Sequence, residues 1–375
     1  MKLEYTKNHI IQLDGLRFFA ILMVMFAHFA QWQFDSIVIR SFPFVYGVTL
    51  FFVLSGFLIT RILIENKAKF EEAGRPKKSL VKAFYIRRFL RIFPVYYLTI
   101  FVLLAISFPN IREYFWWLVT YTINILQTVE NAHPENFQHF WSLAVEEQFY
   151  LFWPWLMLFI SRKHLEKVII AAILIALSSK LLFFFMNWGW LANSSFTINC
   201  MHALGLGALA AYWSVYRKKL YKRLAHPIVT YSVIAFYVLY LFVQTYFNIQ
   251  IFKAVFNEFF FAVGSAAIII RASQNGFRYL GKAILENRFV TYSGKISYGI
   301  YIFHLYVPAL SLYLSKELGI TVENRVALFI YQYFLAFLLA HLSWKYFESP
   351  INKLKSRFPY FKKEELAEPD PGIKK

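Results

Sequence analysis

The sequence predicts an all-α polytopic membrane protein with about ten transmembrane helices and both termini on the cytoplasmic side. Hydrophobic residues make up 59% of the 375-residue chain, and aromatic residues make up 21%. Apolar stretches of about 20 residues recur along nearly its whole length, and each is long enough to cross ~30 Å of hydrocarbon. This hydrophobicity excludes a set of soluble domains, and a β-barrel would show alternating strands of about ten residues instead.

Ten stretches have the length and hydrophobicity of a full span. In chain order they lie at about 13–33, 43–64, 88–108, 141–160, 168–188, 195–215, 226–247, 251–271, 292–314 and 325–346. We expect the shorter apolar piece at 114–128 to form one re-entrant or interfacial helix. The chain then divides into a membrane domain at 1–350 and a short, charged cytoplasmic tail at 351–375, which we expect to be frayed.

The net charge of +19 predicts how the chain is oriented. In a soluble protein it would indicate nucleic acid, but most of the 40 Lys and Arg residues lie in loops that ten spans place in the cytoplasm. If 114–128 crossed the membrane, the basic loop 216–225 and the basic C-terminal segment would lie outside, against the positive-inside rule. We therefore expect membrane lipids as partners and no nucleic acid.

Cysteine and histidine usage argues against a metal centre. The single cysteine, Cys200, excludes an internal disulfide and a multi-cysteine metal site. The histidines outside the bundle core lack ligand spacings such as HExxH, so no metal is expected. A cleavable signal peptide is not expected either, because the first apolar segment carries Asp14 and Arg17 at its start.

The first predicted span carries two ionisable side chains, which are costly inside a membrane and functional by default. Arg17 and His28 are eleven residues apart, so they share one helix face and lie ~16 Å apart along its axis. Arg17 then lies near the inner interface and His28 near mid-bilayer. The structural alternative is an interfacial anchor plus a core histidine that bonds to a neighbouring backbone.

Charged residues also begin the third predicted span. Arg88 and Arg91, at i and i+3, are neighbours on one helix face. A pair of forked guanidinium groups suits a phosphate, although cytoplasmic anchoring explains these arginines equally well.

The fourth predicted span begins with a polar turn that is unsuited to lipid contact. Glu146 and Glu147 point ~100° apart, so we expect only one of them to face the interior. Gln148 and Tyr150 lie within the same turn. Hydrogen bonding between helices is the structural alternative to a functional site here.

Three further spans carry polar groups at depth. Ser297, Tyr301 and His304 follow the i, i+4 and i, i+3 spacings of one stripe, with His304 near mid-membrane. The pair Ser55–Gly56 sits mid-span, where small residues favour close helix packing. Lys180 lies deep in the fifth span, where snorkelling outward and lining a cavity are equally good interpretations.

Six of these stretches, taken in order, resemble the acyltransferase-3 family of integral membrane acyltransferases over about residues 10–350. They read LDGLR with a histidine eleven residues after its arginine, GVTLFFVLSGFLIT, RRFLRIFPVYYL, WSLAVEEQFYLFWP, GKISYGIYIFHL and FESP. The sequence departs from the family pattern at Thr49, where the family often has an acidic residue. Many members also carry an appended extracytoplasmic hydrolase-like domain, which we do not expect here because the chain is short.

The resemblance implies transfer of an acyl group, usually acetyl, from cytoplasmic acyl-CoA to a hydroxyl of an extracytoplasmic glycan or lipid-linked sugar. It also implies a ten-span fold in a bacterial cytoplasmic membrane. The donor's phosphates would then bind to Arg88 and Arg91. Arg17 would either join them or hold Asp14 and position the helix.

On the same reading His28 is the catalytic base, and Glu146, the acid of the family motif WSLxxE, is its carboxylate partner. Direct transfer and an acyl-histidine intermediate both stay open. The remaining candidates for cavity-lining or substrate contact are Ser55, Gln148, Tyr150, Tyr301, His304 and Lys180.

Two other classes of protein are possible on sequence alone. A transporter or flippase of lipid-linked saccharides also carries polar residues at mid-membrane, but the chain lacks inverted repeats and paired Gly/Pro-broken helices. A non-catalytic scaffold does not explain arginines aligned below a buried histidine.

Overall fold

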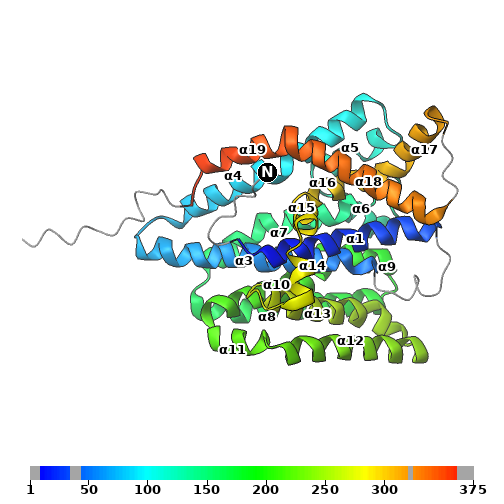
Figure 1. The fold of residues 1–375 in the computed structure, drawn as a ribbon. Helices are drawn as coiled ribbons and strands as arrows, with labels where there is room; N and C mark the ends of the chain where they lie inside the picture. Colours follow the sequence, from blue (N-terminus) through cyan, green and yellow to red (C-terminus); the bar gives the residue numbers. More distant parts are fainter. Residues whose placement is uncertain (1–8, 34–43, 320–323, 361–375) are drawn as a thin grey trace, which may run out of the picture.

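The computed structural model describes residues 9–33, 44–319 and 324–360, and within these ranges the chain is helical with no strand. The long helices run roughly parallel to one another in a layered bundle (Figure 1). The first half consists of α1 (Ile11–Gln33), η1 (Phe44–Tyr46), α3 (Gly47–Glu72), α4 (Lys77–Ala105), α5 (Ile111–Val119), α6 (Ile123–Glu130), α7 (Phe140–Phe159), α8 (Arg162–Phe185) and α9 (Trp190–Ser195).

The second half begins at the centre of the bundle and ends on its far side from α8. It consists of α10 (Thr197–Tyr216), α11 (Lys218–Leu224), α12 (Pro227–Phe247), η2 (Phe252–Phe256), α13 (Asn257–Ala272), α14 (Tyr279–Leu285), α15 (Arg288–Lys295), α16 (Ser297–Phe303), η3 (His304–Tyr306), α17 (Val307–Glu317), α18 (Arg325–Ser343), η4 (Trp344–Glu348), α19 (Ser349–Lys353) and η5 (Leu354–Arg357).

Seven helical stretches of the described residues are long and apolar enough to cross a membrane, which supports an integral membrane protein. An eighth candidate is the pair Arg288–Lys295 and Ser297–Glu317, whose two parts are bent by 60°. The helices α7 and α10 coincide with two more predicted spans, but neither is among the seven. The count of ten and the cytoplasmic side of the termini therefore stay predictions.

The apolar piece at 114–128 differs from the single helix that we predicted. It forms two helices, α5 of nine residues and α6 of eight, which are separated by a turn at Tyr121 with φ +53°. Neither approaches the ~20 residues of a span. The polar residues Thr120 and Thr122 bond to each other and to the α5 carbonyls, which ends that helix.

The predicted frayed tail is ordered at its start. Helix α19 and the 3-10 turn η5 extend to Arg357 and lie against α4. Arg87 Nη1 donates to the carbonyls of Lys355 at 2.9 Å and Phe358 at 3.1 Å. Residues 361–375 lie outside the described residues.

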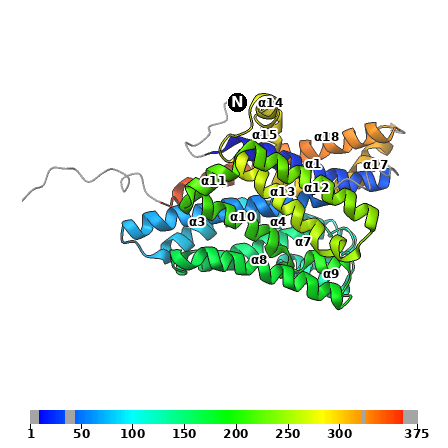
Figure 2. The same ribbon diagram turned by 90° about the horizontal axis from the view of Figure 1, so that it is seen from below.

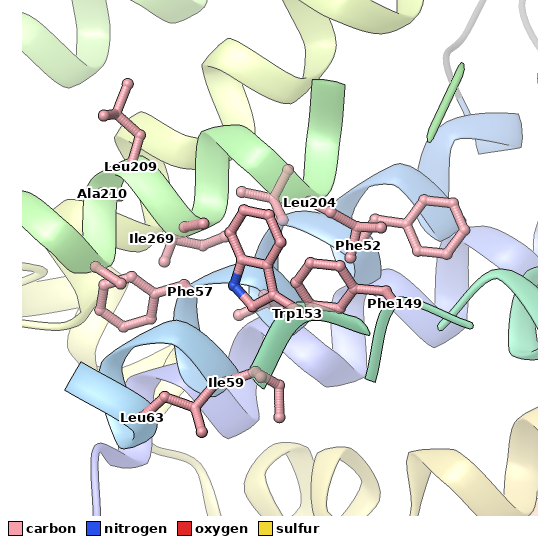
Figure 3. Close-up of a cluster of buried hydrophobic side chains, with 14 of the residues drawn as sticks. Phe52, Phe57, Ile59, Leu63, Phe149, Trp153, Leu204, Leu209, Ala210 and Ile269 are labelled. Carbon is pink, nitrogen blue, oxygen red and sulfur yellow. The ribbon is translucent and has the colours of Figure 1, made fainter. Parts of the chain in front are cut away.

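The interior of the bundle is built around α3 and its neighbours α7 and α10. Trp153 of α7 is buried among side chains of α3, α10 and α13 (Figure 3), and its indole donates to Thr60 at 2.7 Å. Gly56 and Gly207 let α3 and α10 approach closely. A Cβ added at Gly56 would lie 1.9 Å from the Leu204 carbonyl, and one added at Gly207 would lie 2.0 Å from the Val53 carbonyl. The close packing predicted at Ser55–Gly56 is confirmed.

Candidate active site

A cavity of about 500 Å³ lies between α1, α3, α4, α7 and α16, with the C-terminal segment at its edge. The elements come from both ends of the chain, which places residues 9 and 360 at one site. The polar side chains that line it are His9, Arg17, Ser55, Arg87, Arg88, Arg91, Ser142, Glu146, Glu147, Tyr150, Ser297, Tyr298, Tyr301, Lys355 and Tyr360.

Cationic groups from three segments line one part of this cavity. Arg87, Arg88 and Arg91 come from α4, Arg17 from α1 and Lys355 from the C-terminal segment. The guanidinium of Arg88 lies over the ring of Tyr150, 5.6 Å from its centroid. A concentration of guanidinium groups of this kind suits a multiply charged phosphate ligand.

The arginine on α1 is held by a buried carboxylate. Arg17 Nη1 donates to Asp14 Oδ1, and His9 Nε2 lies 2.9 Å from Asp14 Oδ2. Asp14 is 3% exposed, because α1 packs closely on α15: a Cβ at Gly294 would lie 1.9 Å from the Asp14 carbonyl. The position of Arg17 is thus fixed by an ion pair within its own helix.

Carboxylates and hydroxyls line the cavity next to the arginines. Ser55 Oγ donates to Glu146 Oε1 at 2.5 Å and lies 3.0 Å from Tyr150 Oη. Glu147 lines the cavity too, so the prediction that only one of the two glutamates faces the interior is wrong. Side chains ~100° apart on α7 both reach the cavity because it wraps around that face of the helix.

A histidine pair lies behind Tyr301 of α16. His304 Nε2 is 3.0 Å from His28 Nδ1, which joins α1 to η3 across 276 residues of sequence. His304 Nδ1 is 2.6 Å from the carbonyl oxygen of Tyr301, whose side chain lines the cavity. The predicted partner of His28, Glu146, bonds to Ser55 instead.

A third histidine completes this cluster. The ring of His139, just before α7, lies 5.3 Å from that of His304, and its Nε2 is 3.2 Å from the Ile302 carbonyl. Tyr301 Oη donates to the His139 carbonyl at 2.8 Å and also contacts Ser142. Within the described ranges, no group of three or more His, Cys, Asp or Glu side chains is arranged to hold a metal ion.

The comparison with protein families decides between the classes of membrane protein. A model described as an acyltransferase domain matches residues 10–344. The chain belongs to the acyltransferase-3 family. The resemblance seen in the sequence is thereby confirmed, over a range that includes α1, the arginines of α4 and the histidine pair.

Curated relatives of this family member are O-acetyltransferases. The peptidoglycan O-acetyltransferase OatA of Listeria monocytogenes is 28% identical over 378 residues, with 93% of this chain and 57% of the relative covered. The O-acetyltransferase OatA of Staphylococcus aureus is 26% identical over 377 residues, with 93% and 58% covered. The chain thus spans a little over half the length of these relatives. No solved structure matches it.

Three residues predicted to line the acyltransferase cavity are not in its lining, and one of them is His304, which lies behind Tyr301. Gln148 faces away from it, because its amide donates to the Tyr121 carbonyl at 2.8 Å and to Asn124 Oδ1 at 2.9 Å. Lys180, 2% exposed, neither snorkels nor lines the cavity: its Nζ pairs with Glu258 Oε2 at 2.9 Å. The side chains of Gln148 and Lys180 satisfy buried polar groups between helices instead.

Glu258 places a carboxylate beside Thr49, the position at which the sequence departs from the family pattern. Thr49 Oγ1 donates to Glu258 Oε1 at 3.1 Å, and His202 Nε2 lies 3.9 Å from the same oxygen. A carboxylate therefore adjoins position 49 even though α13 rather than α3 supplies it. Together with Lys180, these side chains form a buried charged cluster separate from the cavity.

Sequence reasoning missed several residues of the site. Lys355 lies after the FESP motif, and no sequence pattern pointed to it. Arg87 lies next to Arg88 within the motif RRFLRIFPVYYL, which was the available signal for it. His139 and Ser142 lie at the edge of the WSL motif, which was the available signal for them. Their proximity to Tyr301 depends on packing between α7 and α16, so the spacing of residues within either motif could not predict it.

Proposed function

We propose that this protein is a membrane O-acyltransferase that moves an acyl group, acetyl in the simplest case, from cytoplasmic acyl-CoA to a hydroxyl of an extracytoplasmic glycan. The observation that carries the proposal is one cavity with guanidinium groups in one part and Tyr301, backed by a histidine pair, in another. Neither a scaffold nor a saccharide flippase requires both.

The arginine-rich part of the cavity supports binding of the donor's phosphates. Arg88, Arg91 and Arg87 present forked donors from successive turns of α4, and Lys355 adds an amino group. On α1, Arg17 and His28 are ~16 Å apart along the helix axis, which is comparable to the length of a pantetheine arm. A donor held at the arginines would therefore carry its thioester toward the histidines.

The hydrogen bonds around His304 support the proton positions that a base requires. A carbonyl oxygen accepts only, so His304 Nδ1 donates to Tyr301. In the neutral ring His304 Nε2 is then an acceptor, and His28 Nδ1–H donates to it. In this tautomer the His28 proton is on Nδ1 and the lone pair is on Nε2, which is the state of a general base, and the ring also bonds to the Val24 backbone one turn earlier.

The proposed chemical step then balances without a metal. His28 Nε2 takes the proton of the acceptor hydroxyl while its oxygen attacks the thioester carbonyl carbon. The C–S bond breaks, an ester forms, and the proton on His28 returns to the departing thiolate. His304 holds the His28 ring in the productive tautomer and is a positioning residue. Ser55, Glu146 and Tyr150 position Arg88 through the Tyr150 ring.

The names of the relatives support peptidoglycan as the acceptor. OatA of Listeria monocytogenes is a peptidoglycan O-acetyltransferase, and its similarity covers 93% of this chain. We extend this to the present chain as a proposal, with a bacterial cytoplasmic membrane as its location.

Mass spectrometry of cell-surface glycans tests the proposal. Cells with the His28→Ala variant should lose O-acetylated glycan while the protein level stays normal. The matched control is His164→Ala, because His164 is an exposed histidine at the start of α8. Normal acetylation in the His28→Ala cells would contradict the catalytic assignment, as would equal losses in both variants.

A further inference from the structure

A second hollow lies at the opposite end of the bundle from the basic helix α11. Its volume is about 670 Å³, and it is bounded by η1, the ends of α8 and α12, helix α9 and the π-helical turn η2. Figures 1 and 2 both place the C-terminal ends of α1 and α12 and helix α9 at this end of the molecule. The charge distribution predicts this end to be extracytoplasmic.

The lining of this hollow differs from that of the first cavity. Aromatic rings and carboxamides dominate it, with Lys253 as the charged side chain among the described lining residues. The first cavity carries four arginines instead. A phosphate-rich donor is therefore a poor match here. The residues that matter for the argument are Tyr46, Phe184, Trp190, Asn193, Gln244 and Asn257.

Two carboxamides in the hollow have unused hydrogen-bonding capacity. Gln244 is 4% exposed, and within the described residues its side chain makes no hydrogen bond. Asn257 Oδ1 is enclosed and has no hydrogen-bond partner there either. Buried polar atoms are normally paired, so these two are suited to a polar ligand or to water that a ligand displaces.

Aromatic rings line the same hollow beside these amides. Trp190 is 56% exposed although it is a large hydrophobic residue, and Tyr46 and Phe184 also line the hollow. A sugar ring has C–H faces that pack on aromatic rings and hydroxyls that both donate and accept hydrogen bonds. Carboxamides match that requirement because each carries a donor and an acceptor.

One residue that lines the hollow, Tyr46, is next in sequence to a glycine that packs on the helix that carries His28. Tyr46 directly precedes Gly47, and a Cβ at Gly47 would lie 2.6 Å from the Ala20 carbonyl and 2.9 Å from Val24 Cγ2. Val24 is one helical turn before His28 on α1. A ligand of several linked sugar units in the hollow would thus lie at the same end of α1 as the proposed base.

We infer that this hollow, between α8, α9, α12 and η2, is the binding groove for an uncharged stretch of the acceptor saccharide. The inference rests on the proposed function, to which it adds where the glycan is held. Trp190 stacks on a sugar ring, while Gln244 and Asn257 bind its hydroxyl or acetamido groups. Asn193 forms the inner wall, where Lys180 Nζ and Asn199 Nδ2 donate to its carbonyl and fix it.

Saccharide binding to purified full-length protein in nanodiscs tests the inference. The probe is a β-1,4-linked tetrasaccharide of N-acetylglucosamine, and binding is followed by saturation-transfer NMR. Trp190→Ala and Gln244→Leu should each raise the dissociation constant by about tenfold or more, as expected for a lost ring contact or a lost polar pair. Trp116→Ala is the control, because Trp116 is 71% exposed on α5, away from the groove.

The controls separate this inference from the proposed function. The His28→Ala variant should bind the tetrasaccharide as the wild type does, although it transfers no acetyl group. The groove variants should keep the thermal shift that acetyl-CoA produces. Wild-type affinity in both groove variants, or no binding to the wild type, would overturn the groove even if His28→Ala proves inactive. A fully active His28→Ala variant would instead count against the proposed function.

Discussion

At the residue scale, the positions of His28 and His304 could be predicted from the sequence, whereas the contact between them could not. The spacing between Arg17 and His28 predicted a polar face on the first helix, and His304 was predicted at similar depth. Their direct contact joins residues 276 positions apart, so no local pattern encodes it. The assumed carboxylate partner of His28 was wrong because Ser55 and Tyr150 surround Glu146.

The role of His304 predicts a graded response to substitution. His304→Leu removes the acceptor for His28 Nδ1–H, and the acetyl-transfer rate should fall by about 10²-fold, the lower range for loss of general-base catalysis. His304→Gln offers a carbonyl oxygen as a substitute acceptor and should recover part of the rate. The measurement is transfer to a soluble saccharide. Equal rates for the two variants would argue against a positioning role.

The buried pair Lys180–Glu258 predicts a stability effect that is distinct from catalysis. Lys180→Met leaves the Glu258 carboxylate buried without its ammonium partner, which typically costs about 3–5 kcal/mol. The midpoint of thermal unfolding in detergent should fall clearly. A Lys180→Met/Glu258→Gln double variant should regain much of this loss. Lys163→Met, at an exposed site at the start of α8, serves as the control. An unchanged midpoint in Lys180→Met would show that the pair is unimportant.

At the element scale, most helix boundaries could be predicted because span length and hydrophobicity are local properties. The end of α3 could not be predicted, because this helix continues beyond the predicted span, through polar residues to Glu72, before the turn at Gly74. The split of the 114–128 segment into α5 and α6 was missed for a similar reason, because the turn at Tyr121 contains neither Gly nor Pro. Hydrophobicity marks membrane depth and does not mark every turn.

Substitution of a tightly packed glycine on α3 and of a loosely packed glycine on α13 should have different effects on stability. Gly56→Ala places a Cβ 1.9 Å from the Leu204 carbonyl, so it should lower stability by about 1–3 kcal/mol through overpacking. Gly264→Ala has no atom within 4 Å of the new Cβ and should be neutral or slightly stabilising. Thermal unfolding of both variants checks this. A tolerated Gly56→Ala would mean that the two helices separate at little cost.

At the scale of the whole molecule, the bundle brings both ends of the chain to one cavity. The sequence predicted arginines at its edge, but the contribution of Lys355 depends on how η5 lies along α4. The two hollows lie at different parts of the bundle and differ in charge. Two separate hollows would suit the proposed transferase, because its charged donor and its neutral acceptor would enter from opposite sides of the membrane.

The predicted orientation can be tested by single-cysteine labelling in a Cys200→Ser background. Cysteine at position 219, in the basic helix α11, should react with an impermeant maleimide only after the membrane is permeabilised. Cysteine at position 248, after α12, should react in intact spheroplasts. The reverse pattern would contradict a cytoplasmic N-terminus together with the assigned spans.

We propose that His28 acts as the base for acyl transfer from a donor bound at the arginines, and this role is central to the function. Its most direct test is transfer of radiolabelled acetyl from acetyl-CoA to the tetrasaccharide by purified protein in proteoliposomes. The wild type should transfer acetyl. The Arg88→Ala/Arg91→Ala variant should require at least about tenfold more donor for half-maximal rate, because charge-assisted phosphate contacts are lost. The His28→Ala variant should transfer nothing, and transfer at the wild-type rate by that variant would contradict the account.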